Sequence, residues 1–291
     1  MHVFLAVVGV ALIAVGLTDM FHTLLHPSGR GRVSHWVFAQ AWRASKATGH
    51  RLGSVLGPAA MVVAISVWVA MHAVGWALIY LPHITDGFTY SSGIDPTAYP
   101  RMVQALYYSV VVLSTLGFGD VVPVDPWIRI VTPLEALTGL ALLTAALTWF
   151  TQMYPPLSRR RALALHLKSL ADSDYAEDLA AIPSETASRV LDELSAEVGQ
   201  VRIDFTQYSE SYYFQERDAD ISLPCQLPYA VRMRDASLAR PEIGVSRSGR
   251  QLAIALEQLG AVLEHNYLHT DETLGGVLAA YAADHAQKTA T

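Results

Sequence analysis

Three long apolar segments constrain the fold of this chain more than any other feature. They cover residues 2–25, 56–81 and 127–150, and each approaches the ~20 residues that a helix needs to cross a bilayer core. Of the 291 residues, 52% are hydrophobic and 16% are charged, whereas soluble domains carry roughly 25% charged residues. We therefore expect an all-α membrane protein with three transmembrane helices.

The first apolar segment has a second interpretation, a cleaved signal peptide. It lacks the basic n-region of such a peptide, and no small-x-small cleavage site precedes its polar end. We therefore interpret residues 1–26 as an N-terminal transmembrane helix, separate from the two later spans.

Basic residues predict the orientation in the membrane. The loop after the first span and the segment after the third are rich in Arg and Lys, whereas residues 82–126 carry only Arg101. By the positive-inside rule, the first loop and the C-terminal half are cytoplasmic and the N-terminus is extracellular. We expect a multi-pass protein of the plasma membrane, in contact with lipids. The basic residues are Arg30, Arg32, Arg43, Lys46, Arg51, Arg159, Arg160 and Arg161.

The chain divides into four predicted parts. Residues 1–26 form the extra span, and residues 27–55 form a connector in which Val33, Trp36, Val37, Ala41 and Ala44 recur at helical spacing. That spacing suits a helix in the membrane interface or a short packed connector. Residues 56–153 form the central membrane domain, and residues 158–291 form a cytoplasmic domain in which Asp and Glu outnumber Lys and Arg.

A short loop between the second and third spans carries the strongest functional signal. Residues 114–120 read S-T-L-G-F-G-D and follow an aromatic-rich helix candidate over 102–113. Glycine accepts φ values that other residues resist, so such a loop can align successive carbonyl oxygens. Four of these loops around one axis make oxygen cages that replace the water shell of K⁺.

The stretch Y-P-R-M-V-Q-A-L-Y-Y-S-V-V-V-L-S-T-L-G-F-G-D-V-V-P-V-D-P-W-I-R, residues 99–129, resembles the pore segment of the tetrameric potassium channel superfamily. It is most similar to the two-span, bacterial proton-activated type. The resemblance covers residues 56–153 and implies a re-entrant pore helix, a selectivity filter and a homotetramer, in which each chain meets three identical subunits. It implies no cofactor other than the K⁺ ions in the filter.

Filter residues follow from this resemblance position by position. Thr115, Leu116, Gly117 and Phe118 would bind K⁺ through backbone carbonyls, with the Thr115 hydroxyl as the innermost ring. Gly119 would complete the outer mouth. Asp120 would lie behind the filter, and Tyr108 matches an aromatic residue that supports it.

Two residues depart from the family pattern. Phe118 replaces the usual filter tyrosine, so one hydroxyl restraint is lost. Val111 replaces a glutamate that pairs with the filter aspartate, so Asp120 needs a different partner or water. Neither change removes a coordinating carbonyl, and we still expect potassium selectivity.

The third span offers two gating candidates. Gly139 matches a hinge position in many family members, but a small residue there also allows close helix contact. Glu135 is an ionisable group at membrane depth, which is costly unless it is functional or paired. It either faces the pore or accepts hydrogen bonds from the pore helix, and we favour the second alternative.

A candidate sensor lies on the first span, where Asp19, His22 and His26 share one helical face. Such a group can bind zinc or respond to protons, or it can be a polar face at the membrane border. No span has arginines at every third position, which is the pattern of a voltage sensor.

The C-terminal half carries a heptad seam typical of a coiled coil, followed by a second leucine-rich stretch. We expect a helical bundle, closed within one subunit or shared among four, with prolines between its helices. The seam is Leu191, Leu194, Val198, Val201, Phe205, Tyr208 and Tyr212; the second stretch is Leu252, Leu256, Leu259 and Leu263; the prolines are Pro224, Pro228 and Pro241.

The function expected from these features is gated, passive K⁺ conduction. No nucleophile, base and orienting acid occur at recognisable spacing, so we do not expect an enzyme. No basic stripe indicates nucleic acid. Two alternatives remain, a nonselective cation channel with a looser filter and a nonconducting membrane sensor.

Overall fold

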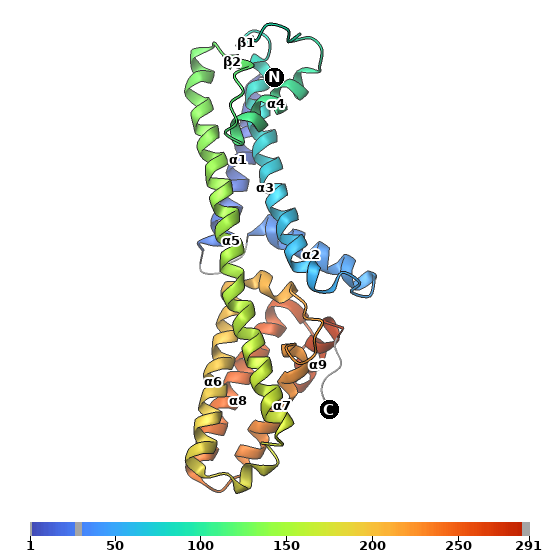
Figure 1. The fold of residues 1–291 in the computed structure, drawn as a ribbon, viewed down its shortest axis with the longest axis vertical. Helices are drawn as coiled ribbons and strands as arrows, with labels where there is room; N and C mark the ends of the chain where they lie inside the picture. Colours follow the sequence, from blue (N-terminus) through green and yellow to red (C-terminus); the bar gives the residue numbers. More distant parts are fainter. Residues whose placement is uncertain (1, 27–30, 287–291) are drawn as a thin grey trace. The chain divides into compact units, whose positions relative to one another are not determined.

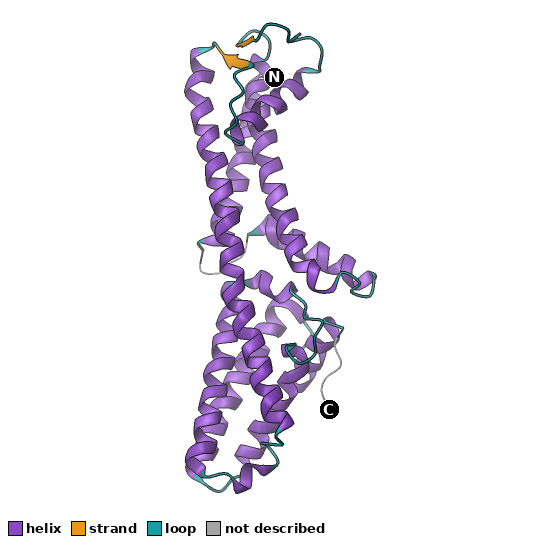
Figure 2. Cartoon of the chain, in the orientation of Figure 1, coloured by secondary structure: helices purple, strands orange, loops and turns teal. Residues whose placement is uncertain are grey.

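The computed structural model describes residues 2–26 and 31–286. The chain forms two compact units. We call Met1–Ser34 with Met61–Thr151 the membrane unit, and His35–Ala60 with Gln152–Thr291 the C-terminal unit. Helices dominate both units, and the described residues include just two short strands (Figure 2).

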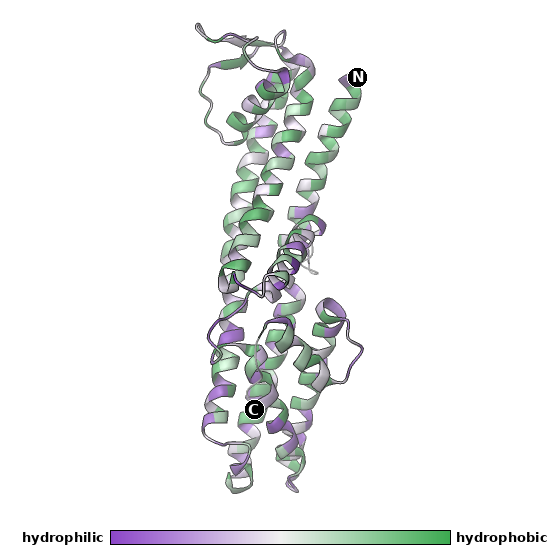
Figure 3. Ribbon diagram, turned by 90° about the vertical axis from the view of Figure 1, so that its right-hand side faces the viewer, coloured by the Kyte–Doolittle hydropathy of each residue, from purple (hydrophilic) through white to green (hydrophobic). Residues whose placement is uncertain are grey.

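Three helices among the described residues are long and apolar enough to cross a membrane, as the sequence predicts. They are α1 (His2–Leu24), the segment Gly53–His83 that contains α3 (Leu56–Tyr80), and α5 (Pro126–Asp172). Apolar residues dominate these helices within the membrane unit, whereas apolar and polar residues mix along the helices of the C-terminal unit (Figure 3). The protein is therefore an all-α membrane protein.

Helix α1 packs against α3 through glycine. A Cβ atom added at Gly9 would lie 2.4 Å from the carbonyl oxygen of Gly75, and one added at Gly75 would lie 2.8 Å from that of Gly9. Small residues let two helix backbones approach closely where lipid offers no hydrophobic drive for association. The extra span is therefore a packed part of the membrane unit.

The segment between α3 and α5 contains helix α4 (Arg101–Leu113), which is also part of the membrane unit. Pro100 directly precedes α4, in agreement with the predicted helix start. Strands β1 (Phe88–Tyr90) and β2 (Val121–Pro123) pair antiparallel, with Tyr90 opposite Val121. They join the two ends of the segment that holds α4 and the glycine loop (Figure 1).

Helix α5 is longer than the sequence suggests. It runs for 47 residues without a break, so it continues through the expected boundary at 153–158 and contributes to both units. Pro155 and Pro156 lie inside it. Because proline has no N–H, the carbonyls four residues earlier lose their helical partners at this point.

In the C-terminal unit, α6 (Ser184–Gln207) packs mainly against α8 (Ile243–Leu263), and α8 also packs against α7 (Leu223–Leu238). The predicted seam is buried on α6, and the leucines of the second stretch are buried on α8. The seam is therefore covered within one chain. Its last two members lie beyond α6: Tyr208 caps the helix, and Tyr212 belongs to the short helical turn η4 (Ser209–Tyr213).

The connector helix α2 (Arg32–Ala47) packs onto this unit from residue 35 onward. Phe38 is fully buried with its ring 5.7 Å from that of Tyr213, and the Trp42 ring lies 5.9 Å from Tyr212. Trp36 is exposed. Of the two interpretations of this segment, the structure shows the packed connector.

Two of the three prolines expected between helices mark helix starts. Pro224 is in the first turn of α7, and Pro241 precedes α8. The prediction for Pro228 is wrong, because this residue lies inside α7. Its missing N–H removes one helical hydrogen bond, to the carbonyl of Pro224 in the first turn, and α7 continues through this position.

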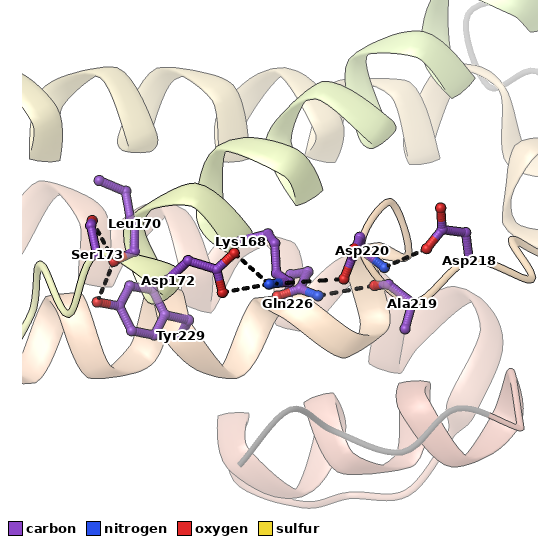
Figure 4. Close-up of polar contacts among 9 residues, drawn as sticks. All are labelled: Lys168, Leu170, Asp172, Ser173, Asp218, Ala219, Asp220, Gln226 and Tyr229. Atoms are coloured by element: carbon purple, nitrogen blue, oxygen red, sulfur yellow. Dashed lines mark hydrogen bonds and ion pairs between the residues drawn. The ribbon is translucent and has the colours of Figure 1, made fainter.

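The remaining elements are a π-helical turn η5 (Glu264–Leu268), α9 (Leu274–Asp284) and the short turns η1 (Gly53–Val55), η2 (Leu81–His83) and η3 (Asp178–Ala181). Polar contacts hold the end of α5 to its neighbours (Figure 4). Lys168 pairs with Asp172 and lies 4.0 Å from Asp220, and the Tyr229 hydroxyl donates to the carbonyl of Leu170 at 3.0 Å. The C-terminal part of α5 is therefore built into the bundle.

Candidate functional site

The glycine loop after α4 alternates its backbone conformation. Thr115, Gly117 and Gly119 have φ values of 56°, 53° and 73°, whereas the intervening Leu116 and Phe118 do not have positive φ. Such alternation turns successive peptide groups the same way, so that N–H groups point to one side and carbonyls to the other. Glycine adopts this conformation freely, but Thr115 does so at a cost of roughly 1–3 kcal/mol.

The carbonyls at the centre of this loop lack hydrogen-bond partners among the described residues, whereas those of Gly119 and Asp120 accept hydrogen bonds from Ser91. None of those of residues 115–118 accepts a hydrogen bond from the described residues. Leu116 and Phe118 are 61% and 63% exposed. Carbonyls exposed in this way can pair with water, a bound ion or a neighbouring molecule.

Asp120 is held by a residue that the sequence analysis missed. The Tyr107 hydroxyl donates to its carboxylate at 2.5 Å, and the backbone N–H of Ser91 donates to its carbonyl at 2.8 Å. The replacement partner that Val111 made necessary is therefore Tyr107. Helical spacing could have distinguished the two adjacent tyrosines of α4. Their side chains point about 100° apart, so only one of them can face Asp120.

Tyr108, the predicted filter support, makes its contacts within the chain at a junction of helices. Its buried hydroxyl is 3.0 Å from the Thr132 hydroxyl on α5, and its ring packs edge-on against Tyr80 and Phe88. Within one chain, Tyr108 therefore supports the junction of α3, α4 and α5, whereas Tyr107 supports the loop.

Glu135 of α5 connects α5 to α4 and α3 through hydrogen bonds. Its side chain is fully buried and accepts hydrogen bonds from the Ser109 hydroxyl of α4 at 2.5 Å and the Tyr80 hydroxyl of α3 at 2.7 Å. The contact with the pore helix is the alternative that the sequence analysis favours. Buried polar groups need such partners, so these hydrogen bonds fasten α4 at a defined depth.

Comparison with known proteins agrees with this geometry. Residues 66–154 match the protein family described as "Ion channel". These residues contain most of α3, all of α4, the glycine loop and the first part of α5. This segment belongs to the ion-channel superfamily.

The chain is also similar to a curated protein. The "Uncharacterized membrane protein YdjJ" of Bacillus subtilis (strain 168) is 26% identical over 170 residues. The match covers 56% of this chain and 48% of the relative, so the chain spans about half the length of the curated relative that it matches. No solved structure matches the chain.

In the channel domain, Gly139 marks a close crossing of α5 and α4. A Cβ atom added at Gly139 would lie 2.0 Å from the carbonyl oxygen of Leu113, the last residue of α4. Helix α5 continues through this position without a break. The structure thus gives Gly139 the role of a small contact residue, which is one of its two predicted roles.

The candidate sensor on α1 does not form as a cluster. The Asp19 carboxylate accepts hydrogen bonds from the backbone N–H groups of Val33 at 2.7 Å and Ser34 at 3.1 Å, and from the Trp68 indole at 2.8 Å. It caps the N-terminus of α2, where the helix dipole favours a negative charge.

The two histidines of that candidate sensor contact each other instead. The His22 and His26 rings stack with centroids 5.1 Å apart, and the Nδ1 atom of His22 lies 2.8 Å from the carbonyl of Thr18. Over residues 2–26 and 31–286, no group of three or more His, Cys, Asp or Glu side chains is placed to hold a metal. The structure therefore replaces the predicted sensor with a helix cap and a histidine pair.

Proposed function

We propose that the channel domain conducts potassium through a filter made of residues 115–119. The observation that carries this proposal is that the carbonyls of residues 115–118, on a loop with alternating backbone conformation, accept no hydrogen bond from the described residues. Carbonyl oxygens that face one axis can replace the hydration shell of K⁺. Thr115, Leu116, Gly117 and Phe118 would supply these oxygens, with the Thr115 hydroxyl at the inner end and Gly119 at the outer mouth.

Conduction through such a filter is passive. A dehydrated K⁺ ion occupies one oxygen cage, and the next ion entering the column displaces it. The Tyr107 hydroxyl holds Asp120 beside the outer mouth. A carboxylate there also raises the local cation concentration.

We propose that the chain forms a homotetramer. One loop cannot enclose an ion path, so copies must meet around an axis in a closed ring. Exposed apolar residues on α5, including Leu134, Leu137 and Leu140, offer surface for lipid, a neighbouring subunit or the pore wall. Four copies give the square of carbonyls that each cage requires.

Orientation and gating complete the proposal. The arginine distribution supports a plasma-membrane protein with an extracellular N-terminus and a cytoplasmic C-terminal unit. We infer that the inner helix α5 transmits gating, because its residues belong to both units. Near the filter, Glu135 and Gly139 couple α5 to α4 through contact rather than as a free hinge.

The test is ion flux from liposomes that contain the purified full chain. We expect the K⁺ flux to be at least tenfold above the Na⁺ flux. The K⁺ flux should be lost in Gly117→Ala, because a Cβ at φ 53° strains the loop. Gly199→Ala is the matched control. Gly199 lies on α6 with open space around its added Cβ, so its flux should equal that of the wild type.

Two results would redirect the proposal. Equal K⁺ and Na⁺ flux would indicate a nonselective cation channel with the same fold. An assembled protein without flux under any pH, voltage or divalent-ion condition would favour a membrane sensor.

A further inference from the structure

A polar pocket of about 280 Å³ lies in the C-terminal unit. Helix α2 forms one wall, and the turns η4 and η5 together with the end of α9 form the others. None of its residues belongs to the filter or to the candidate sensor. It is lined by His35, Ala39, Trp42, Arg43, Lys46, Tyr212, Tyr213, Asn266, Tyr267, His269 and Asp284.

The acidic residue in this pocket is already neutralised. The Asp284 carboxylate accepts hydrogen bonds from the Trp42 indole at 2.9 Å and the Tyr212 hydroxyl at 2.7 Å, and it pairs with Lys46. Burial and the neighbouring Asp284 charge raise the pKa of Tyr212, so this residue stays a neutral donor. The pocket therefore has little capacity to attract a cation.

Several donors in the pocket remain available. Arg43 is exposed and forms no ion pair with any described residue. The side chains of Asn266 and His269 form no hydrogen bond within the described chain. Glu264, the nearest acid to His269, is occupied by the Thr270 hydroxyl and the backbone N–H of Asp271. The available groups thus favour an anion.

We propose that this pocket binds a phosphate group. The guanidinium of Arg43, the amide of Asn266 and the imidazole of His269 together suit a tetrahedral anion with several acceptor oxygens. The volume is just below the ~300–1,000 Å³ of drug-sized sites, so it admits a phosphate with a short attached group. The Tyr212 and Tyr267 rings, stacked at 4.1 Å, form a rigid wall beside it.

The phosphate can come from a lipid headgroup or from a soluble ester. Arg43 and Lys46 precede the membrane-spanning segment Gly53–His83 by about ten residues, which places them near a membrane border in the sequence. A ligand on Tyr212 and Tyr213 would also touch the segment that Arg160 of α5 holds, through the carbonyls of Ser211 at 2.8 Å and Phe214 at 2.7 Å. Binding itself does not depend on the proposed conduction.

Calorimetric titration of the full chain in neutral detergent tests this site without measuring flux. The probes are glycerol 3-phosphate and dioctanoyl phosphatidic acid, and dioctanoyl phosphatidylcholine is the lipid control. We expect Arg43→Gln to weaken binding by about tenfold or more, because a charge-assisted hydrogen bond is lost. Arg250→Gln should bind as the wild type does, since Arg250 is also exposed and forms no ion pair with the described residues.

A second variant, Asn266→Ala, tests the site independently in case Arg43→Gln impairs folding. It should weaken binding by about fivefold. Tighter binding of phosphatidic acid than of glycerol 3-phosphate assigns the site to a lipid headgroup. Equal binding of the two assigns it to a soluble phosphate ester. Absence of binding, or binding that neither variant weakens, overturns the proposal.

Discussion

The two units of this protein differ in how much of their apolar surface is buried within the chain. The C-terminal unit buries the leucines of α6 and α8 against each other within one chain. The membrane unit leaves Leu116, Phe118 and one face of α5 exposed. The heptad seam therefore serves the fold of a single chain, whereas the exposed apolar surface of the membrane unit is open to lipid or to a neighbouring molecule.

The units also pack their helices differently. In the membrane unit, backbones approach at Gly9, Gly75 and Gly139, where a methyl group would collide with a carbonyl oxygen. In the C-terminal unit, large side chains such as Leu194 and Leu256 fill the space between helices. This is the contrast expected between helices in lipid, where close contact replaces the hydrophobic drive, and helices in water.

The first prediction tests whether the seam is internal. Leu194→Ala should lower the unfolding free energy of the C-terminal unit by about 2–5 kcal/mol, because Leu194 is fully buried and its truncation leaves a cavity. Chemical denaturation followed by circular dichroism measures this loss. Leu238→Ala, at an exposed leucine of α7, should cost far less.

The same variant distinguishes internal from intersubunit packing. Native mass spectrometry of Leu194→Ala should give the wild-type oligomer. Dissociation into single chains before the C-terminal unit unfolds would place the seam between subunits and break the comparison.

The second prediction tests the glycine crossing in the membrane unit. Gly139→Ala should lower stability by about 1–3 kcal/mol, because its methyl group meets backbone that cannot rotate away. Thermal unfolding in detergent measures the change, with Gly199→Ala as the control of unchanged or slightly raised stability. A variant with wild-type stability and altered opening would support a hinge at Gly139 instead.

The third prediction separates the two tyrosines of α4. Tyr107→Phe should weaken stabilisation by K⁺ by about 1 kcal/mol, because Asp120 loses its donor beside the filter. Tyr108→Phe should lower stability equally with and without K⁺, since its hydroxyl contacts Thr132 on α5. The unfolding temperature as a function of K⁺ concentration tells the two apart. Equal K⁺ dependence in both variants would contradict the assignment.

The fourth prediction concerns acid sensitivity of the C-terminal unit. Burial, reinforced by the Arg160 charge, holds the pKa of His285 well below its usual 6.5. Below pH 6.5, His285 is therefore protonated in the unfolded chain but stays neutral in the folded unit. As the pH falls, this difference lowers the free energy of unfolding by up to about 1.4 kcal/mol per pH unit. The cost vanishes above pH 6.5.

His285→Phe keeps an aromatic ring against Trp42, Tyr212 and Tyr281 but cannot be protonated. The variant should lose less stability than the wild type between pH 7.5 and 5.5, as measured by thermal unfolding. His265→Gln, at an exposed position on η5, serves as the control. An identical pH dependence in His285→Phe and wild type would remove His285 as a source of acid sensitivity.

Local pattern along the chain was enough to predict the elements. Span length identified the three membrane helices, Pro100 and the glycine loop bounded α4, and the leucine period located the core faces of α6 and α8. Each of these features depends on neighbours within a few residues, where hydrophobic period and backbone preference act directly. The stretch over residues 99–129, which includes the motif S-T-L-G-F-G-D, carried the channel resemblance.

Partners between elements were decided by the tertiary structure alone. Asp19 meets the start of α2 rather than the neighbouring histidines, Tyr107 rather than Tyr108 reaches Asp120, and Arg43 joins a pocket whose other walls come more than 160 residues later. Which of several equivalent polar groups a side chain meets depends on helix rotation and crossing distance. These follow from packing of the whole chain, so spacing in the sequence does not specify them.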